Sequence, residues 1–293
     1  EAKKHLQSIS PPFVIKADGL AAGKGVFICD KLTEACNIID EIIINNKFGK
    51  AGNEIVIEQF LDGIELSVFI LTDGHSYKML PSAKDYKRVG ENDTGLNTGG
   101  MGAISPFPFL EKEITEKIKK KIIAPTLDGL KKEAIEYMGF IFFGLIIVDK
   151  EPFVIEYNVR LGDPETQVVL PRIKSDFLEI LLNVSSKKVF SKSELIISEE
   201  SATTVIMSSG GYPEKYKTGM AVRGLEKIQD SLVFHAGIKL KNGEHITNGG
   251  RVLAVTSCAK KMEKAINKSY ENIKKIQFEN SYFRKDIGKD VLK

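Results

Sequence analysis

Short apolar runs separated by glycine, proline and acidic turn residues dominate the first 80 positions of the chain. Such runs are typical of β-strands, and they predict strands at 13–16, 26–29, 55–60, 65–72 and 76–80. Residues 32–47 differ, because their apolar side chains recur at helical spacing and Thr33 is available as an N-cap. The first 70 residues therefore predict a compact α+β unit.

The pattern changes after residue 84. Residues 84–106 are polar and contain five glycines, which predicts a long loop of the kind that is usually functional or disordered. The downstream pattern predicts a helix at 111–138, interrupted at Pro125, antiparallel strands at 140–148 and 152–158, and a short helix at 177–184. After a connection at 187–200, it predicts strands at 202–207, 232–238 and 251–256 and a helix at 260–276.

Composition narrows the class of protein. A formal charge of +3 over 293 residues gives no reason to expect nucleic-acid binding. The longest apolar run, 140–148, is too short for a membrane span. Three cysteines without a CxxC pair suit a reducing compartment, and the four histidines have no metal-ligand spacing. We therefore expect a cytoplasmic protein that does not bind membranes, with no secretory signal at its start.

The stretch VIKADGLAAGKGV, residues 14–26, is the first candidate for chemistry. Glycines let backbone amides approach a polyphosphate, and Lys16 and Lys24 add positive charge. A P-loop does not fit, because Gly19 and Gly23 are separated by three residues and Gly25 stands where the magnesium-binding hydroxyl should be. The pattern indicates a phosphate-covering flap between two strands, and a flexible hairpin without a ligand stays open as the alternative.

The second candidate is the strand at 152–158 and its continuation. Along a strand, Glu156, Asn158 and Arg160 share one face. Oxygen donors from Glu156 and Asn158 suit magnesium, and Arg160 could hold a transferring phosphoryl group. The alternative is a solvent-facing polar edge, which the apolar neighbours at 153–155 and 157 disfavour.

Two weaker candidates remain. Residues 56–65 could offer backbone groups to adenine, with Glu65 near ribose, although a plain hairpin fits the pattern better. Residues 85–102 carry cations and glycine amides that could receive phosphate or carboxylate, and a surface loop is an equal alternative.

These stretches together resemble the glycinamide ribonucleotide synthetases, also called phosphoribosylamine–glycine ligases. The matching segments occur in order along the chain: VIKADGLAAGKGV (14–26), DTGLNTGGMGA (93–103), RLGDPETQ (160–167), FHAGIKL (234–240), TNGGRVL (247–253) and FRKDIG (283–288). The resemblance implies ligation of glycine to 5-phosphoribosylamine with ATP in de novo purine biosynthesis, through a glycyl phosphate. No Ser/His or Cys/His nucleophile set is visible, in keeping with that chemistry.

The resemblance also implies an architecture and a set of roles. The fold would be α+β, an ATP-grasp fold in which two α+β subdomains enclose ATP, followed by a smaller mixed α/β domain; we expect a monomer. The implied divisions are a lid subdomain at 1–72, a large subdomain with the metal site at 73–190 and a C-terminal domain at 191–293. The implied ATP-binding residues are Lys16, Gly23, Lys24, Gly25, Glu58, Gln59, Phe60, Leu61 and Glu65. The resemblance further implies that Glu156 and Asn158 bind Mg²⁺ or Mn²⁺. The implied catalytic residues are Arg160, Lys87 and Asp163, and the implied substrate-binding residues are Asp85, Arg88, Gly99 and Gly100.

Three departures from the family pattern affect these expectations. Members usually begin with an N-terminal domain, and the resemblance places Glu1 already inside the ATP-grasp region, so turnover by this chain alone is doubtful. Residues 84–88 read Lys-Asp-Tyr-Lys-Arg where the family more often has Gln-Asp-His-Lys-Arg. The run 140–148 offers no further metal carboxylate. A carboxylase-type ATP-grasp enzyme and a non-catalytic nucleotide-binding module are the competing interpretations. In the C-terminal part, we expect Lys285 and Asp286 to form a structural ion pair, with a functional role as the alternative.

Overall fold

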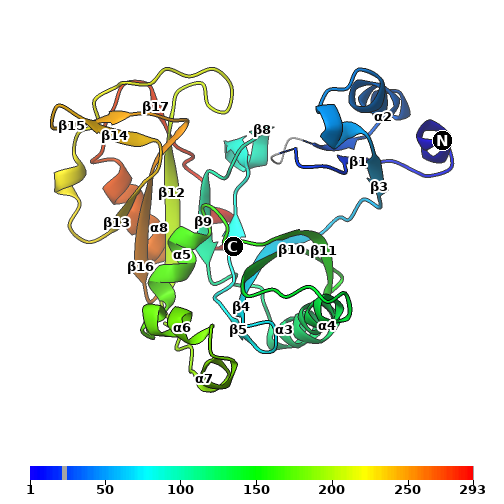
Figure 1. The fold of residues 1–293 in the computed structure, drawn as a ribbon. Helices are drawn as coiled ribbons and strands as arrows, with labels where there is room; N and C mark the ends of the chain where they lie inside the picture. Colours follow the sequence, from blue (N-terminus) through cyan, green and yellow to red (C-terminus); the bar gives the residue numbers. More distant parts are fainter. Residues whose placement is uncertain (22–24, 293) are drawn as a thin grey trace. The chain divides into compact units, whose positions relative to one another are not determined.

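The computed structural model describes residues 1–21 and 25–292. It divides into two compact units, Glu1–Asp62 and Gly63–Lys293 (Figure 1). Their boundary falls earlier than the end of the lid subdomain expected at residue 72. The reason is that strand β4 (Ile64–Thr72) pairs along its length with β10 (Gly139–Val148), so residues 64–72 belong to a sheet of the second unit.

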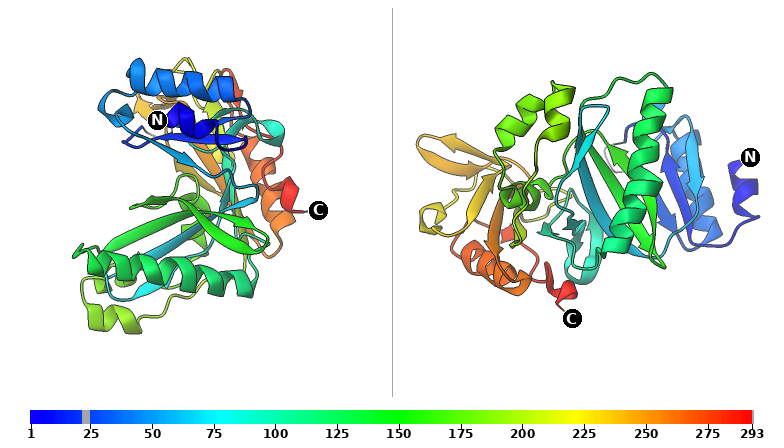
Figure 2. Two further views of the ribbon diagram at one scale, coloured as in Figure 1. Left: turned by 90° about the vertical axis from the view of Figure 1, so that its right-hand side faces the viewer. Right: turned by 90° about the horizontal axis from the view of Figure 1, so that it is seen from below.

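The first unit contains an antiparallel sheet of order β2-β1-β3, formed by β1 (Phe13–Ala17), β2 (Val26–Cys29) and β3 (Ile55–Glu58). Helix α2 (Leu32–Ile39) continues into a π-helical turn, Asp40–Ile44, and packs on β1 and β2, while α1 (Ala2–Leu6) packs on α2 (Figure 2). Its core includes Leu6, Phe13, Ile15, Ile39 and Ile42. The α+β unit and the first two predicted strands are confirmed, whereas the strand predicted at 55–60 ends at Glu58.

The second unit begins with a sheet of order β11-β10-β4-β5, in which β5 is Tyr77–Met79 and β11 is Glu151–Asn158. One face packs against a continuous helix made of α3 (Lys112–Ile118), a π turn (Lys119–Ile123) and α4 (Ala124–Lys132) (Figure 2). The expected break at Pro125 is absent. Proline has no amide hydrogen to donate to the helical hydrogen-bond ladder. The π turn ends just before Pro125, so this donor is lost where the regular α-helical hydrogen bonding is already interrupted. The helix ends at Lys132 rather than at 138.

A second sheet in this unit has the order β13-β16-β12-β9-β6, and β17 also pairs with β12. Its strands are β6 (Lys84–Asp85), β9 (Gly102–Ser105), β12 (Ser201–Ser209), β13 (Leu232–His235), β16 (Arg251–Ala259) and β17 (Ser281–Tyr282), and α8 (Met262–Ile273) packs on β12 and β16. The prediction of a loop at 84–106 is therefore wrong, because β6 and β9 are strands of this sheet. Between them, β7 (Arg88–Gly90) and β8 (Thr94–Asn97) form a small hairpin.

Smaller elements complete the second unit. Helices α5 (Thr166–Val169), α6 (Phe177–Asn183) and α7 (Lys187–Lys192) follow the first sheet, so the stretch at 187–200 includes a helix and is not only a connection. The hairpin β14 (Ile238–Lys241) and β15 (Glu244–Thr247) lies between β13 and β16 in the sequence. In the part of the chain that the structure describes, no helix is long and apolar enough to cross a membrane.

Candidate active site

The polar side chains at the end of β11 form a hydrogen-bonded row. Asn158 donates from Nδ2 to Glu156 Oε1 at 3.2 Å, and Arg160 donates from Nη2 to Asn158 Oδ1 at 3.3 Å. Gly144 on β10 makes room for this row, since a Cβ there would lie 2.8 Å from Glu156 Cγ. The expected alignment of the three side chains on one face is therefore present.

The exposure of this row differs from the premise of the sequence argument. β11 is at the edge of its sheet, Glu156 and Arg160 are exposed, and the neighbouring Tyr157 is 51% exposed. The apolar neighbours thus do not bury the polar groups within this unit, and the support for a ligand comes from their alignment. A carboxylate and a carboxamide are hard oxygen donors that fit Mg²⁺, which keeps waters and phosphate oxygens as its other ligands. Among the described residues, no group of three or more His, Cys, Asp or Glu could hold a metal ion alone.

Lys87 lies in an acidic surrounding next to that row. Its Nζ is 2.7 Å from Glu65 Oε2, and Asp85 and Glu156 are near enough to raise the pKa of the lysine further, against the effect of its burial. Burial raises the pKa of Asp85, Lys87 lowers it, and Glu65 and Glu156 raise it again. These residues line a narrow cavity of about 10 Å³, enough for roughly one water molecule. The structure therefore brings the predicted residues 65, 85, 87 and 156 together, with Glu65 paired to lysine.

Glu165 belongs to the same region, although its residue type and spacing did not single it out. It is 4% exposed and accepts a hydrogen bond of 3.0 Å from Ser67 Oγ. Burial, and then the nearby charge of Asp85, raise its pKa to about 7. A buried carboxyl with such a pKa is a frequent property of functional sites. The available signal was its place in the RLGDPETQ segment.

The predicted substrate loop and Asp163 are also brought together. Asp163 Oδ2 is 2.7 Å from Arg251 Nη2, and the same guanidinium donates to the carbonyl oxygens of Gly99 and Gly100. Arg88 lies apart from this contact and donates from Nη1 to Gly95 O at 2.9 Å. Arg251 was not predicted, and it shows that the C-terminal part contacts the candidate site.

The FRKDIG segment contacts the 85–95 region through Arg284. Arg284 is 1% exposed and pairs with Asp93 and Asp286, each at 2.7 Å. It also donates to Arg88 O at 3.0 Å and lies over the Tyr86 ring, 5.3 Å from its centroid. Asp286 is therefore in a structural ion pair, as expected, but its partner is Arg284 and not Lys285.

The predicted nucleotide residues of the first unit are on its sheet and the segment that follows. Lys16 on β1 pairs with Glu58 on β3, with 2.5 Å between Nζ and Oε2. Gly25 is buried, and a Cβ there would lie 2.8 Å from that of Ala21. The predicted residues Gly23 and Lys24 lie outside the described residues. Gln59, Phe60 and Leu61 follow β3 directly.

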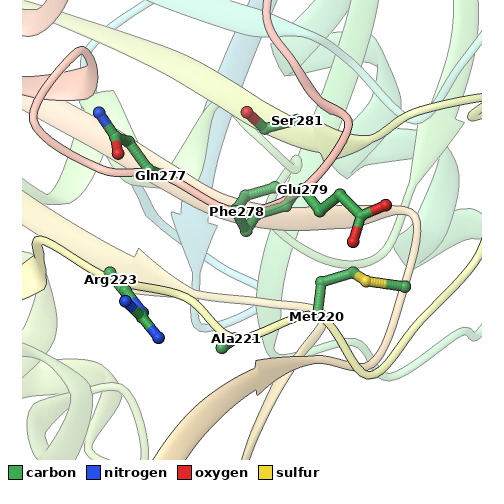
Figure 3. A pocket seen from close by; sticks show the side chains of 7 residues that line it. All are labelled: Met220, Ala221, Arg223, Gln277, Phe278, Glu279 and Ser281. Atoms are coloured by element: carbon green, nitrogen blue, oxygen red, sulfur yellow. The ribbon is translucent and has the colours of Figure 1, made fainter.

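A larger open groove lies elsewhere in the second unit and shares no residue with the acidic cavity. Its volume is about 540 Å³, and two segments line it, 220–223 and 277–281 (Figure 3). Backbone hydrogen bonds of 2.9 Å in both directions join Arg223 and Gln277. Because none of the predicted site residues faces this groove, its size does not make it the candidate active site.

Known families and relatives match almost the whole length of this chain. The profile of the phosphoribosylglycinamide synthetase ATP-grasp (A) domain matches residues 1–166, and that of the C domain matches residues 202–290. A phosphoribosylamine–glycine ligase of Fusobacterium nucleatum is 47% identical over 98% of this chain and 68% of its own length. For a Chlorobaculum tepidum enzyme of the same name, the values are 45%, 96% and 67%. The chain thus spans about two thirds of these relatives.

Solved structures give the same result. The crystal structure of a Thermotoga maritima phosphoribosylamine–glycine ligase matches with a TM-score of 0.90 and 36% identity, over 98% of this chain and 71% of that one. A biotin carboxylase domain from Hydrogenobacter thermophilus matches over 96% of this chain and 60% of its own, with a TM-score of 0.66 at 16% identity, which shows the fold alone.

The fold and the site together define an ATP-grasp ligase. The family model over residues 1–166 and the match to a ligase of the same fold carry this assignment, and the carboxylate, carboxamide and guanidinium row at the end of β11 is the candidate site within it. Within that class, the chain belongs to the phosphoribosylglycinamide synthetase family, whose ATP-grasp and C domains it contains.

Proposed function

We propose that the protein ligates glycine to 5-phosphoribosylamine at the expense of ATP, giving glycinamide ribonucleotide, ADP and phosphate. The observation that carries this proposal is the meeting of the Glu156–Asn158–Arg160 row with Lys87 and its acidic neighbours in one unit. The names of the relatives support the same substrates.

The first step is attack of a glycine carboxylate oxygen on the γ-phosphorus of ATP, which releases ADP and forms glycyl phosphate. An anion that attacks a polyanion needs positive charge around the reacting oxygens, and Lys87 and Arg160 supply it. Asp85 and its acidic neighbours attract the ammonium group of glycine, which orients its carboxylate toward the phosphate. Glu156 and Asn158 would hold Mg²⁺ or Mn²⁺, which would neutralise charge on the nucleotide phosphates.

In the second step, the amine of 5-phosphoribosylamine attacks the acyl carbon, the carbon–oxygen bond to phosphate breaks, and an amide forms. In this proposal, the substrate contacts Arg88, Gly99 and Gly100. Asp163 is the third catalytic residue, with Arg160 and Lys87. For ATP, Lys16, Gly23, Lys24 and Gly25 would bind the phosphates, Glu58–Leu61 the adenine and Glu65 the ribose. Lys16 pairs with Glu58 and Lys87 with Glu65, so each lysine would exchange a carboxylate for a phosphate partner on binding.

The test is ADP release by the complete native polypeptide with Mg·ATP, glycine and phosphoribosylamine generated in situ, omitting each component in turn. We expect turnover to need both glycine and phosphoribosylamine and to be lost in folded Lys16→Ala and Glu156→Ala variants. The exposed residues Lys4 and Glu133, each replaced by alanine, are matched controls.

The alternatives give different results. Dependence on bicarbonate instead of glycine would indicate a carboxylase-type enzyme. Tight Mg·ATP binding with no turnover for any substrate pair would indicate a nucleotide-binding module. A monomeric state and a cytoplasmic location belong to the same proposal, and sedimentation and fractionation measure them.

A further inference from the structure

Arg251 lies at the start of β16, in the TNGGRVL segment. Its side chain contacts residues of the candidate site and not the hydrophobic core. Its guanidinium faces Asp163 with two parallel hydrogen bonds, Nη2 to Oδ2 at 2.7 Å and Nη1 to Oδ1 at 3.3 Å. Nη1 also reaches the carbonyl oxygens of Gly99 and Gly100. A forked cation with a carboxylate is among the strongest and most directional of polar contacts. One side chain therefore ties two separate segments of the candidate site together.

The neighbouring glycines explain how Arg251 reaches this position. A Cβ at Gly250 would lie 2.2 Å from the Tyr212 ring, and a Cβ at Gly249 would lie 2.9 Å from Gly237 Cα. The close packing brings the Tyr212 hydroxyl to Gly99, whose amide donates to it at 3.0 Å. Gly99 is thus held from both sides, through its amide by Tyr212 and through its carbonyl by Arg251.

The held loop is hydrogen-bonded to the backbone of Lys87. Thr98 donates to the Lys87 carbonyl twice, from its amide at 2.8 Å and from Oγ1 at 2.7 Å. Gly100 in turn donates its amide to Thr98 Oγ1 at 2.9 Å. A displacement of residues 98–100 is therefore transmitted to the backbone that carries Lys87.

The second segment that Arg251 contacts includes Arg160, the other cation proposed to act on the phosphoryl group. Asp163 follows Arg160 by three residues, and Gly100 packs so closely on the following Pro164 that a Cβ would lie 2.3 Å from its Cδ. The loop with Lys87 and the bend with Arg160 therefore share a single junction, and Arg251 is at its centre. Displacements of about 1 Å in such arrangements can cost a hundredfold in rate.

We propose that Arg251, assisted by Tyr212, is a positioning residue for the ligase reaction, fixing the 98–100 loop on Asp163 so that Lys87 and Arg160 face the same phosphoryl group. The proposal rests on the function proposed above. Arg251 itself need not touch substrate, because its hydrogen bonds are directed to protein oxygens.

Two measurements on Arg251→Ala, Arg251→Lys and Tyr212→Phe test it, with exposed Arg223→Ala as the matched control. The first is amide hydrogen exchange of the 94–101 segment. In Arg251→Ala we expect exchange there to be at least about tenfold faster, with β12 and β16 unchanged. Tyr212→Phe keeps the ring on Gly250 but removes the acceptor for the Gly99 amide, so it should accelerate exchange at that amide even if Arg251→Ala does not fold.

The second measurement is kcat beside the Kd for Mg·ATP in the complete native polypeptide. Arg251→Ala should lower kcat about a hundredfold with Kd changed less than about twofold, and Arg251→Lys should recover part of the loss. Unchanged exchange, or faster exchange with kcat equal to that of Arg223→Ala, would overturn the positioning role. If the wild-type protein releases no glycine-dependent ADP, the proposed function fails, and the exchange data still decide whether Arg251 and Tyr212 hold the loop.

Discussion

The buried carboxyl of Glu165 makes the stability of the protein depend on pH in a predictable direction. Its pKa is raised from the ordinary 4.5 to about 7 in the folded state. Between these values the folded protein binds more protons than the unfolded chain, so the free energy of unfolding falls as pH rises. The stability that protonation supplies is complete below pH 4.5 and is lost as pH passes through about 7.

The size of the effect follows from the same two values. Each pH unit between them corresponds to about 1.4 kcal/mol, so ionisation of Glu165 removes about 3 kcal/mol by pH 8. In Glu165→Gln the neutral amide still accepts the hydrogen bond from Ser67 and has no charge to bury. We therefore expect the variant to gain about 3 kcal/mol relative to the wild type between about pH 4.5 and about pH 8.

The assay is urea unfolding of both proteins at several pH values across this range. Comparing the two proteins removes the contribution of every other titrating group except Asp85, which interacts with Glu165. Glu133→Gln, an exchange of the same kind at an exposed position, is the control. A difference between Glu165→Gln and wild type that stays constant with pH would refute the reasoning.

Three further predictions concern the supporting structure and the nucleotide. Arg284→Met should lower the free energy of unfolding by roughly 3 kcal/mol, since it leaves its acidic partners without a buried cation; urea unfolding measures this, and a loss below about 1 kcal/mol would contradict it. Gly144→Ala should lower kcat about tenfold by displacing Glu156, with little change in melting temperature, and normal turnover would show that the space is not needed. Lys16→Ala should weaken Mg·ATP binding about tenfold or more in calorimetric titration, and an unchanged Kd would remove Lys16 from the phosphate site.

The sequence predicted best those features whose signal is local. The apolar runs that form β10 and β11 were sufficient to place both strands and the alignment of Glu156 and Asn158. The segment 84–106 was not predictable in this way, because two-residue strands such as β6 have no periodicity to detect. Of its strands, β9 pairs with β12, which lies about a hundred residues later in the chain, and β6 pairs with β9.

The missed site residues share the same cause. Glu165 acquires its environment from Ser67, 98 positions away, and Arg251 meets Asp163 across 88 positions. Neither contact leaves a local pattern, so only the matching RLGDPETQ and TNGGRVL segments pointed to them. The exposure of Glu156 corresponds to the solvent-facing edge that the sequence argument disfavoured, because an edge strand and a central strand can have the same residue pattern.

The central claim, that glycine is activated as glycyl phosphate, is tested most directly by the fate of its carboxylate oxygens. Glycine labelled with ¹⁸O in both carboxylate positions is turned over by the complete native polypeptide with Mg·ATP and phosphoribosylamine, and the released phosphate is examined by mass spectrometry. The account predicts one ¹⁸O atom in each phosphate, because the oxygen that attacks phosphorus leaves with it when the amide forms. Unlabelled phosphate, with glycinamide ribonucleotide formed, would contradict the account.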